Sequence, residues 1–207
     1  MKTMKVSLLV VTVLALVSVA PATQHLVPDW YLSIQDAVNA ATSGDTISVW
    51  GPPPGQDSPP YVYGENVDFN GKSLVVASRC FLPGWQGCQP TWDSVVIDGS
   101  NQAGPVVTMT GSESAVPRVV LKGFTITGRG STFGGGIYCQ DVVAVTEKNY
   151  VHDCVAGTSG GGVCHWHRYN NSDETLLSLA AASSRTKPSR ATVAASTSTE
   201  QSPSATR

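Results

Sequence analysis

Charged side chains are scarce in this chain. They make up 14% of its 207 residues, and 13 Lys and Arg against 15 Asp and Glu leave a formal net charge of -2. A protein that binds nucleic acid through its phosphates needs a clustered basic face. The charge balance provides no such face, so we expect no nucleic-acid partner, and no acidic partner is implied.

Long apolar runs are also nearly absent. The one such run, residues 6–19, follows Lys2 and Lys5 and precedes a small-x-small motif at 20–22, which is the layout of a secretory signal peptide. It is shorter than the ~20 residues that a spanning helix needs, so an uncleaved anchor is the weaker interpretation. We predict cleavage after Ala22, a mature protein that is secreted or held at the cell surface, and no membrane attachment once the signal is removed.

Segments that could form crossover helices are missing as well. The chain has 20 Gly and 13 Pro, yet its apolar fraction of 41% is too high for simple disorder, which favours turn-rich β structure. Short β-branched runs follow one another without room for a helix between them, and this excludes a doubly wound α/β sheet. An antiparallel sandwich stays open beside parallel coils. The expected strands are 45–50, 61–69, 73–78, 95–99, 106–109, 119–121, 124–127, 137–139, 142–145, 150–151 and 163–164, with loops at 51–60 and 79–93.

One short helix is predicted ahead of the strands. Residues 33–41 place apolar side chains at i, i+3, i+4 and i+7, with Ser33 suited to the N-cap and Gly44 to the end. We expect about three turns, laid across the apolar end that stacked β structure would otherwise expose.

A glycine triplet occurs twice. Residues 134–136 precede Ile137, and residues 160–162 precede Val163 in the same way. Such self-similarity is typical of a chain that stacks one small unit on itself, so we predict coils of ~20 to 26 residues that give strands to parallel sheets. The triplets should make the same tight corner in successive coils, with Ile137 stacked on Val163 and Cys139 close to Cys164.

The order of short phrases resembles a known family. SIQDAV (33–38), GDTISV (44–49), YGENV (63–67), GKSL (71–74), VVIDG (95–99), GFTIT (123–127) and GGGIYC (134–139) follow one another as in the N-terminal half of secreted bacterial right-handed parallel β-helix proteins of the pectin-lyase-like superfamily. The resemblance extends over roughly residues 30 to 165. It implies an all-β, right-handed parallel β-helix with a short N-terminal capping helix. Because the superfamily contains lyases, hydrolases, esterases and coils without known chemistry, it implies a fold more strongly than a function.

The repeating pattern stops near His165. No glycine follows Gly162, and 22 of the 36 residues at 172–207 are Ser, Thr or Ala. Such a composition buries little apolar surface. We therefore predict a signal peptide at 1–22, one β-helix domain at 23–168 and a disordered tail at 169–207. We interpret the abrupt change as the end of a fragment, or of a shifted reading frame.

Five cysteines fit an oxidising compartment and leave one of them unpaired. Cys80 and Cys88 enclose the short segment 81–87, so we predict a disulfide between them. Cys139 and Cys164 are expected to be buried free thiols.

Groups that could carry catalysis are isolated in the sequence. A polysaccharide-cleaving β-helix needs paired carboxylates, or a calcium site with an Arg or Lys base, on one sheet. The Asp-Asp and Arg-x-Lys phrases of polygalacturonase-like relatives are absent. Asp98 and Asp153 suit turn caps, and His152 and Asp153, adjacent on a strand, should point to opposite faces. We predict no catalytic residue and no cofactor; the residues considered were Asp98, Asp141, Glu147, His152 and Asp153.

Two further groups of charged or metal-ligating residues are not assigned a functional site. His165 and His167 would lie on one side of a strand, but two ligands do not make a metal site, so we predict no metal. Arg118 and Lys122 flank an apolar strand and suit solvated edges that discourage further pairing.

Aromatic residues near the loops are the remaining functional signal. Exposed aromatic rings can stack on sugars. The same rings could instead pack around the Pro-rich loop, and both explanations stay open. The candidate sugar-stacking residues are Tyr61, Tyr63, Trp85 and Trp92, with Trp50 nearby. We expect a secreted, non-catalytic module that contacts polysaccharide. The alternatives are a carbohydrate-active enzyme resembling pectin esterases or lyases, and a purely structural stalk.

Overall fold

The computed structural model describes residues 22–52, 59–85, 94–111, 119–128, 133–158 and 160–166, together with the backbone of Ser178–Ala180. The signal-peptide prediction, except for Ala22, and most of the predicted tail lie outside these residues. In the described part of the chain, no helix is long and apolar enough to cross a membrane.

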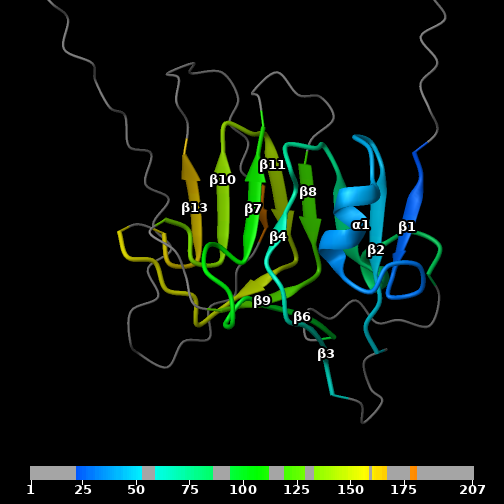
Figure 1. The fold of residues 1–207 in the computed structure, drawn as a ribbon, viewed down its shortest axis with the longest axis horizontal. Coiled ribbons are helices and arrows are strands. Elements are labelled where there is room, and N and C mark those ends of the chain that lie inside the picture. Colours follow the sequence, from blue (N-terminus) through cyan, green and yellow to red (C-terminus); the bar gives the residue numbers. More distant parts are fainter. Residues whose placement is uncertain are drawn as a thin grey trace, which may run out of the picture.

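Three sheets of short parallel strands make up the molecule (Figure 1). Sheet A contains β1 (Gln24–Val27), β2 (Thr46–Val49), β5 (Val75–Ser78), β8 (Val119–Lys122), β11 (Ala144–Glu147) and β14 (Ser178–Ala180). Sheet B contains β3 (Tyr61–Tyr63), β6 (Val95–Asp98), β9 (Thr125–Thr127) and β12 (Tyr150–Val151). Sheet C contains β4 (Val67–Asp68), β7 (Val107–Thr110), β10 (Ile137–Gln140) and β13 (Val163–Trp166).

From β2 onward the chain visits sheets A, B and C in turn and then returns to A. All of the strand pairs between described residues are parallel, which removes the antiparallel sandwich for this part of the chain. The structure is therefore predominantly β and compatible with a parallel β-solenoid.

The predicted repeat is confirmed at the glycine triplets. Ile137 pairs with Val163, so the two residues that follow the triplets in the sequence are neighbours in sheet C. The backbone N–H of Gly135 donates to the carbonyl of Gly160, and Gly134 and Gly160 open the two corners at φ values of 61° and 66°. Earlier coils are longer than predicted: Val75 pairs with Val120 because residues 79–93 and 111–118 are inserted between them.

Side chains of successive strands stack into rows between the three sheets. Alternating burial along β6, β8 and β10 sends every second side chain inward, as the pleat requires. The rows are His25, Ile47, Val76, Leu121 and Thr146 in sheet A; Tyr63, Ile97, Ile126 and Val151 in sheet B; and Val67, Val107, Ile137 and Val163 in sheet C.

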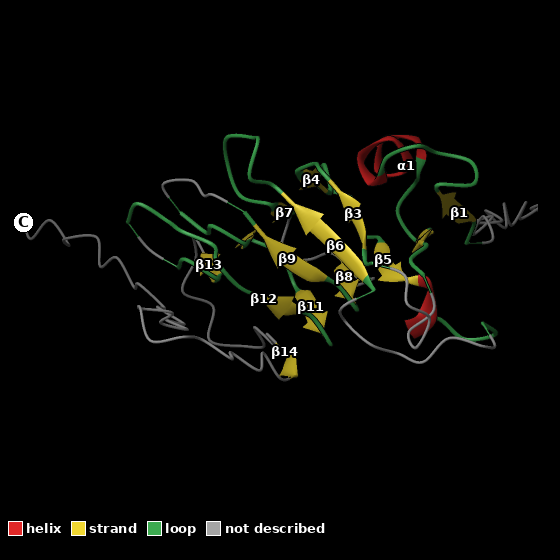
Figure 2. Cartoon of the chain, turned by 90° about the horizontal axis from the view of Figure 1, so that it is seen from below, coloured by secondary structure: helices red, strands yellow, loops and turns green. Residues whose placement is uncertain are grey.

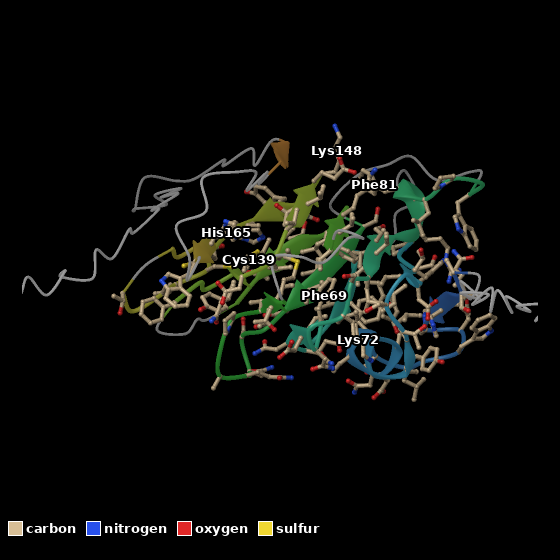
Figure 3. The ribbon with its side chains drawn as sticks, turned by 90° about the horizontal axis from the view of Figure 1, so that it is seen from above. Phe69, Lys72, Phe81, Cys139, Lys148 and His165 are labelled. Carbon is tan, nitrogen blue, oxygen red and sulfur yellow. The ribbon has the colours of Figure 1, made fainter. Side chains whose placement is uncertain are left out.

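Cys139 and Cys164 lie near each other as predicted, close enough for Cys164 to contribute to the raised pKa of Cys139, but they are not direct partners across the strands. Cys139 pairs with His165, whereas Cys164 pairs with Tyr138. The glycine triplets align without a gap, so the two cysteines are one residue out of register. Figure 3 shows Cys139 and His165 next to each other in neighbouring strands.

The predicted helix is present but shorter. Helix α1 (Ile34–Ala40) begins at Ser33, whose hydroxyl accepts from Asp36 N at 3.0 Å, and it buries Ile34, Ala37 and Val38. It ends before Gly44, because Ala41 already has an extended backbone with ψ of 157°. The helix packs on β1, β2 and β4, at the end of the coils where we expected it (Figure 1).

Side chains from the first coil fix both ends of α1. The Glu65 carboxylate accepts from Ile34 N at 2.8 Å and Gln35 N at 2.9 Å. The Lys72 ammonium, beside the helix in Figure 3, donates to three carbonyls at its C-terminal end, at 2.8 to 2.9 Å. The turn at Asn70 and Gly71 that positions Lys72 has the two positive φ values expected of an Asn-Gly turn.

Two strands lie outside the predicted set. β1 precedes the helix and pairs with β2 along its full length. β14 lies within the predicted tail and pairs with β11 through its backbone. An edge strand such as β11 can accept a strand of almost any sequence, because the pairing uses main-chain groups.

Candidate functional site

The strongest candidate site is a cluster that we call the aromatic patch: Trp50, Tyr61, Tyr63, Arg79 and Trp85. Trp50 follows β2, and its backbone N–H donates to the Val27 carbonyl oxygen at 2.8 Å. Tyr61 and Tyr63 lie on β3, the last strand of sheet B on the α1 side. Arg79 begins the 3-10 helix Arg79–Phe81, which opens the insertion that carries Trp85.

The Tyr61 ring contacts the rings of both Trp50 and Tyr63. The Tyr61 ring lies edge-on to Trp50, with 5.7 Å between centroids, and 4.9 Å from the centroid of Tyr63. These separations are typical of favourable aromatic pairs. Tyr63 OH donates to Trp50 O at 3.1 Å, which ties the start of β3 to the end of β2.

Arg79 connects the patch to the loop before α1. Its guanidinium carbon lies 4.4 Å from the Trp85 ring centroid, a cation–π arrangement, and Nη2 donates to Asp29 Oδ2 at 2.8 Å. Burial raises the pKa of Tyr63 well above its usual value, and the Tyr61, Glu65 and Asp29 charges act in the same direction. The positive charge of Arg79 opposes that shift, which places the guanidinium within electrostatic range of the Tyr63 hydroxyl.

The predicted sugar-stacking residues differ in how exposed their side chains are. Tyr61 is 40% exposed and suits the role, and Trp85 is half-buried beneath Arg79. Tyr63 is only 4% exposed, so its assignment is corrected: it pairs with the fully buried Ile97, and its ring lies inside the coil. Tyr61, two residues earlier, lies on the same side of β3 but is exposed. Trp92 lies outside the described residues.

A second group of polar residues lies on the outer face of sheet B. Asp98 pairs with Thr127, and His152 follows β12 with its N–H bonded to Ile126 O, which sets it beside Thr127. The Tyr150 and His152 rings are 4.8 Å apart with an interplanar angle of 32°. Side chains from three coils therefore meet on one face.

The expectation for His152 and Asp153 was wrong in its geometry. The two residues do not point apart, since His152 Nδ1 lies 2.9 Å from Asp153 Oδ2. β12 ends at Val151, and Asp153 has φ of 52°, so the alternation rule for strands does not apply to it. Its carboxylate is 87% exposed.

The remaining carboxylates are dispersed. Asp98 caps a turn as predicted, accepting from Ser100 N at 2.8 Å. Glu147 forms an ion pair of 2.7 Å with Lys122 on sheet A, and Asp141 lies at the end of β10 in sheet C. The structure places these three carboxylates on different sheets, so they do not form an acid pair. Arg118 lies outside the described residues.

The cysteines behave as structural residues. Cys80 is disulfide-bonded, but Cys88 lies outside the described residues, so their pairing stays a prediction. Cys139, Cys154 and Cys164 are free thiols. Burial raises the pKa of Cys139 and of Cys154 to about 12, so the Cys154 thiol near His152 is not an activated nucleophile.

Sequence reasoning missed a buried polar cluster at β1. His25 Nε2 lies 3.0 Å from Asp45 Oδ2 and His25 Nδ1 lies 3.3 Å from Tyr31 OH, with both His25 and Asp45 almost fully buried. Asp45 also accepts from Thr23 N and from the N–H and hydroxyl of Thr42. No local pattern reveals such a cluster, because its members come from a strand, a loop and a turn that are distant from one another in the sequence.

The described residues contain one further cavity and no cluster of metal-ligating side chains. A cavity of about 210 Å³ lies between Thr23, Thr46, Leu82 and their neighbours and is lined by no titratable side chain. Within the same ranges no three His, Cys, Asp or Glu side chains gather as metal ligands. His165 Nε2 lies 3.3 Å from Val142 O, and His167 lies outside the described residues.

Comparisons of this chain with protein-family models, curated proteins and solved structures find no significant match. The functional argument therefore rests on the residues and on their geometry.

Proposed function

We propose that this protein is an extracellular, non-catalytic module that binds polysaccharide through the aromatic patch. The observation that carries the proposal is Tyr61, whose exposed ring is held in place by Trp50 and Tyr63 on the last strand of a sheet. A ring that is exposed yet fixed offers a flat apolar face at low cost in side-chain entropy, which suits stacking on a sugar.

The proposal includes the finer fold and location. The order of sequence phrases, together with three parallel sheets visited in turn, supports a right-handed β-helix of the pectin-lyase-like type. The N-terminal segment supports secretion. Asp98, Asp141 and Glu147 lie on three different sheets and form no acid pair among themselves, which favours binding over cleavage for these three, because glycoside hydrolysis needs two carboxyl groups within about 10 Å of each other.

The test is binding of the full mature chain to soluble pectin, β-glucan, xylan and mannan by affinity electrophoresis and calorimetry. We expect at least one polymer to bind and Tyr61→Ala to weaken that binding about tenfold, as expected for the loss of a stacked ring. Phe133→Ala is the matched control, since Phe133 is 46% exposed and lies outside the patch. Absence of binding to all four polymers, or equal loss in both variants, would overturn the proposal.

The enzyme alternative is tested in the same samples. Reducing-sugar release, unsaturated-product absorbance and methanol release are followed for each polymer. Turnover that disappears in Asp98→Ala or Asp153→Ala would replace the binding module by a carbohydrate-active enzyme.

A further inference from the structure

The backbone nitrogen of Thr23, just ahead of β1, lies against a buried carboxylate. Thr23 N donates to Asp45 Oδ1 at 2.8 Å, and the Thr23 carbonyl accepts from Thr46 N at 2.9 Å. Figure 2 shows β1 beside α1 at one end of the coils. The position of the Thr23 nitrogen is therefore fixed by the pairing of β1 with β2 and by the turn that carries Asp45.

Asp45 is a buried acid whose partners carry no fixed positive charge. It is only 5% exposed, and among the described residues its carboxylate meets Thr23, Thr42 and His25. His25 can fill its place as a neutral ring, with Nε2 donating to Asp45 and Nδ1 accepting from Tyr31 OH at 3.3 Å. Because acidic side chains are almost never buried without a charged partner, a cation at this position would be strongly favoured.

The predicted cleavage site lies at the same nitrogen. The small-x-small motif at 20–22 predicts cleavage after Ala22, which makes Thr23 the first residue of the mature protein. Both residues are exposed, and both line the cavity of about 210 Å³. Hydrolysis of the bond between them consumes one water and yields a carboxylate on Ala22 and an ammonium group on Thr23. At pH 7 the single amide N–H is thereby replaced by three donors and a positive charge, and the donors that do not face Asp45 can bond to water in the cavity.

We propose that removal of the signal peptide after Ala22 creates an α-ammonium group on Thr23 that forms an ion pair with the buried Asp45 carboxylate and fastens β1 to sheet A. The inference rests on the secretion included in the proposed function and is independent of polysaccharide binding. Before cleavage the same nitrogen is a neutral amide donor, and hydrogen bonds between charged groups are about twice as strong as neutral ones. Processing therefore stabilises the folded chain as well as shortening it.

The first experiment compares three chains that differ only at the amino terminus. The mature chain begins at Thr23, the extended chain begins at Ala22, and the acetylated chain is the mature chain whose α-amine was acetylated in guanidinium chloride at about pH 6.5, where α-amines react before lysine, and then refolded. The mature chain, taken through the same steps without reagent, melts about 3 to 6 °C above the other two at pH 7, as expected for one charge-assisted contact in a domain of this size.

Substitution of the carboxylate tests the partner. In Asp45→Asn the three chains melt within about 1 °C of one another, because the ammonium group has lost its counter-charge. Asp29→Asn is the matched control: the Asp29 carboxylate binds Arg79 after the other end of β1, so its removal leaves the difference between the three chains intact.

A second measurement does not require the variant to fold. With Asp45 present, the α-amine of the folded mature chain reacts with acetic anhydride about tenfold more slowly than that of the folded extended chain, because amines react as the free base and the ion pair keeps the Thr23 amine protonated. Equal rates together with equal melting temperatures would overturn the proposal. A difference in melting temperature that persists in Asp45→Asn would also overturn it.

The cleavage itself is tested by expressing residues 1–207 in a secreting bacterial host. Mass spectrometry of the exported product should show a chain that begins at Thr23, and a different first residue contradicts the inference. Polymer binding by a mature chain that melts like the extended chain would leave the binding module standing and remove the ion pair. The reverse result would retain the ion pair and remove the binding module.

Discussion

Replacing Asp45 by Asn should weaken the attachment of β1 to the rest of sheet A. The Asp45 carboxylate accepts from Thr23 N at 2.8 Å, from Thr42 N at 2.8 Å and from the Thr42 hydroxyl at 3.0 Å, and it lies 3.0 Å from His25 Nε2. These contacts join the start of β1 to the turn before β2. Asn keeps one acceptor oxygen and turns an NH2 group toward donors, so at least one buried donor loses its partner.

The expected cost follows from the number and kind of bonds. A hydrogen bond to a charged group contributes about 1.5–3 kcal/mol, and a buried donor left unsatisfied costs about 1–3 kcal/mol. Asn retains part of the network, so Asp45→Asn should lower the free energy of unfolding by about 2–4 kcal/mol at pH 7. Denaturant unfolding followed by tryptophan fluorescence measures this. Asp153→Asn is the control, since its 87% exposed carboxylate should contribute less than about 0.5 kcal/mol.

The effect should also depend on pH. Burial alone would raise the pKa of Asp45, but the hydrogen bonds from Thr42, Thr23 and His25 outweigh it and hold that pKa well below its ordinary value of 3.8. The charge of Asp45 therefore stabilises the folded state above the unfolded pKa, and this stabilisation is lost as the pH falls toward the folded pKa. The difference between wild type and Asp45→Asn should be constant above about pH 5 and should shrink below about pH 4. A difference under about 1 kcal/mol at pH 7, or one that does not narrow in acid, would refute the reasoning.

Three further predictions concern stability and thiol chemistry. Lys72→Met removes three hydrogen bonds to the C-terminal end of α1 and should cost about 2 kcal/mol in urea unfolding; a change below about 0.5 kcal/mol would count against this role. Gly135→Ala should destabilise by at least about 2 kcal/mol, because a Cβ there would meet Gly161 O at 2.5 Å, whereas Gly64→Ala, with open space around it, should be nearly neutral in the same melts. With pKa values of about 12, Cys139 and Cys154 are roughly one part in ten thousand ionised at pH 8, so iodoacetamide should label them only after unfolding, and rapid native labelling seen by mass spectrometry would contradict this.

Local patterns were sufficient to predict the repeat and the cap. The spacing of the two glycine triplets is also the pairing register of β10 and β13, because identical corners in adjacent coils must align. Alternation in 95–99 predicted β6, and the apolar spacing in 33–41 predicted α1. The end of the helix was missed because Lys72, which holds its last carbonyls, comes from a turn beyond β4 that no helical pattern includes.

The site was less accessible to sequence reasoning. A count of aromatic residues found Tyr61 and Trp85 but could not tell that Tyr63 is buried while Tyr61, two residues earlier on the same side of β3, is 40% exposed. The contact of His152 with Asp153 depended on a positive φ just past a strand of two residues. The His25 cluster had no signal at all, because β1 was not predicted and its partners become neighbours only after the coil closes.

The lengths of the coils explain the position of the aromatic patch. The coil from Val119 of β8 to Ala144 of β11 has just enough chain for three strands and their corners. The earlier coils carry extra residues between sheets A and B, after β2 and after β5, and these insertions bring Trp50 and Trp85 to the start of sheet B. Phe81, near the start of the second insertion, lies against the residue that follows β8, where a Cβ on Gly123 would collide with its ring. The insertion that carries Trp85 thus packs against the end of β8 in sheet A, while Tyr61 and Tyr63 of the same patch lie on β3 of sheet B.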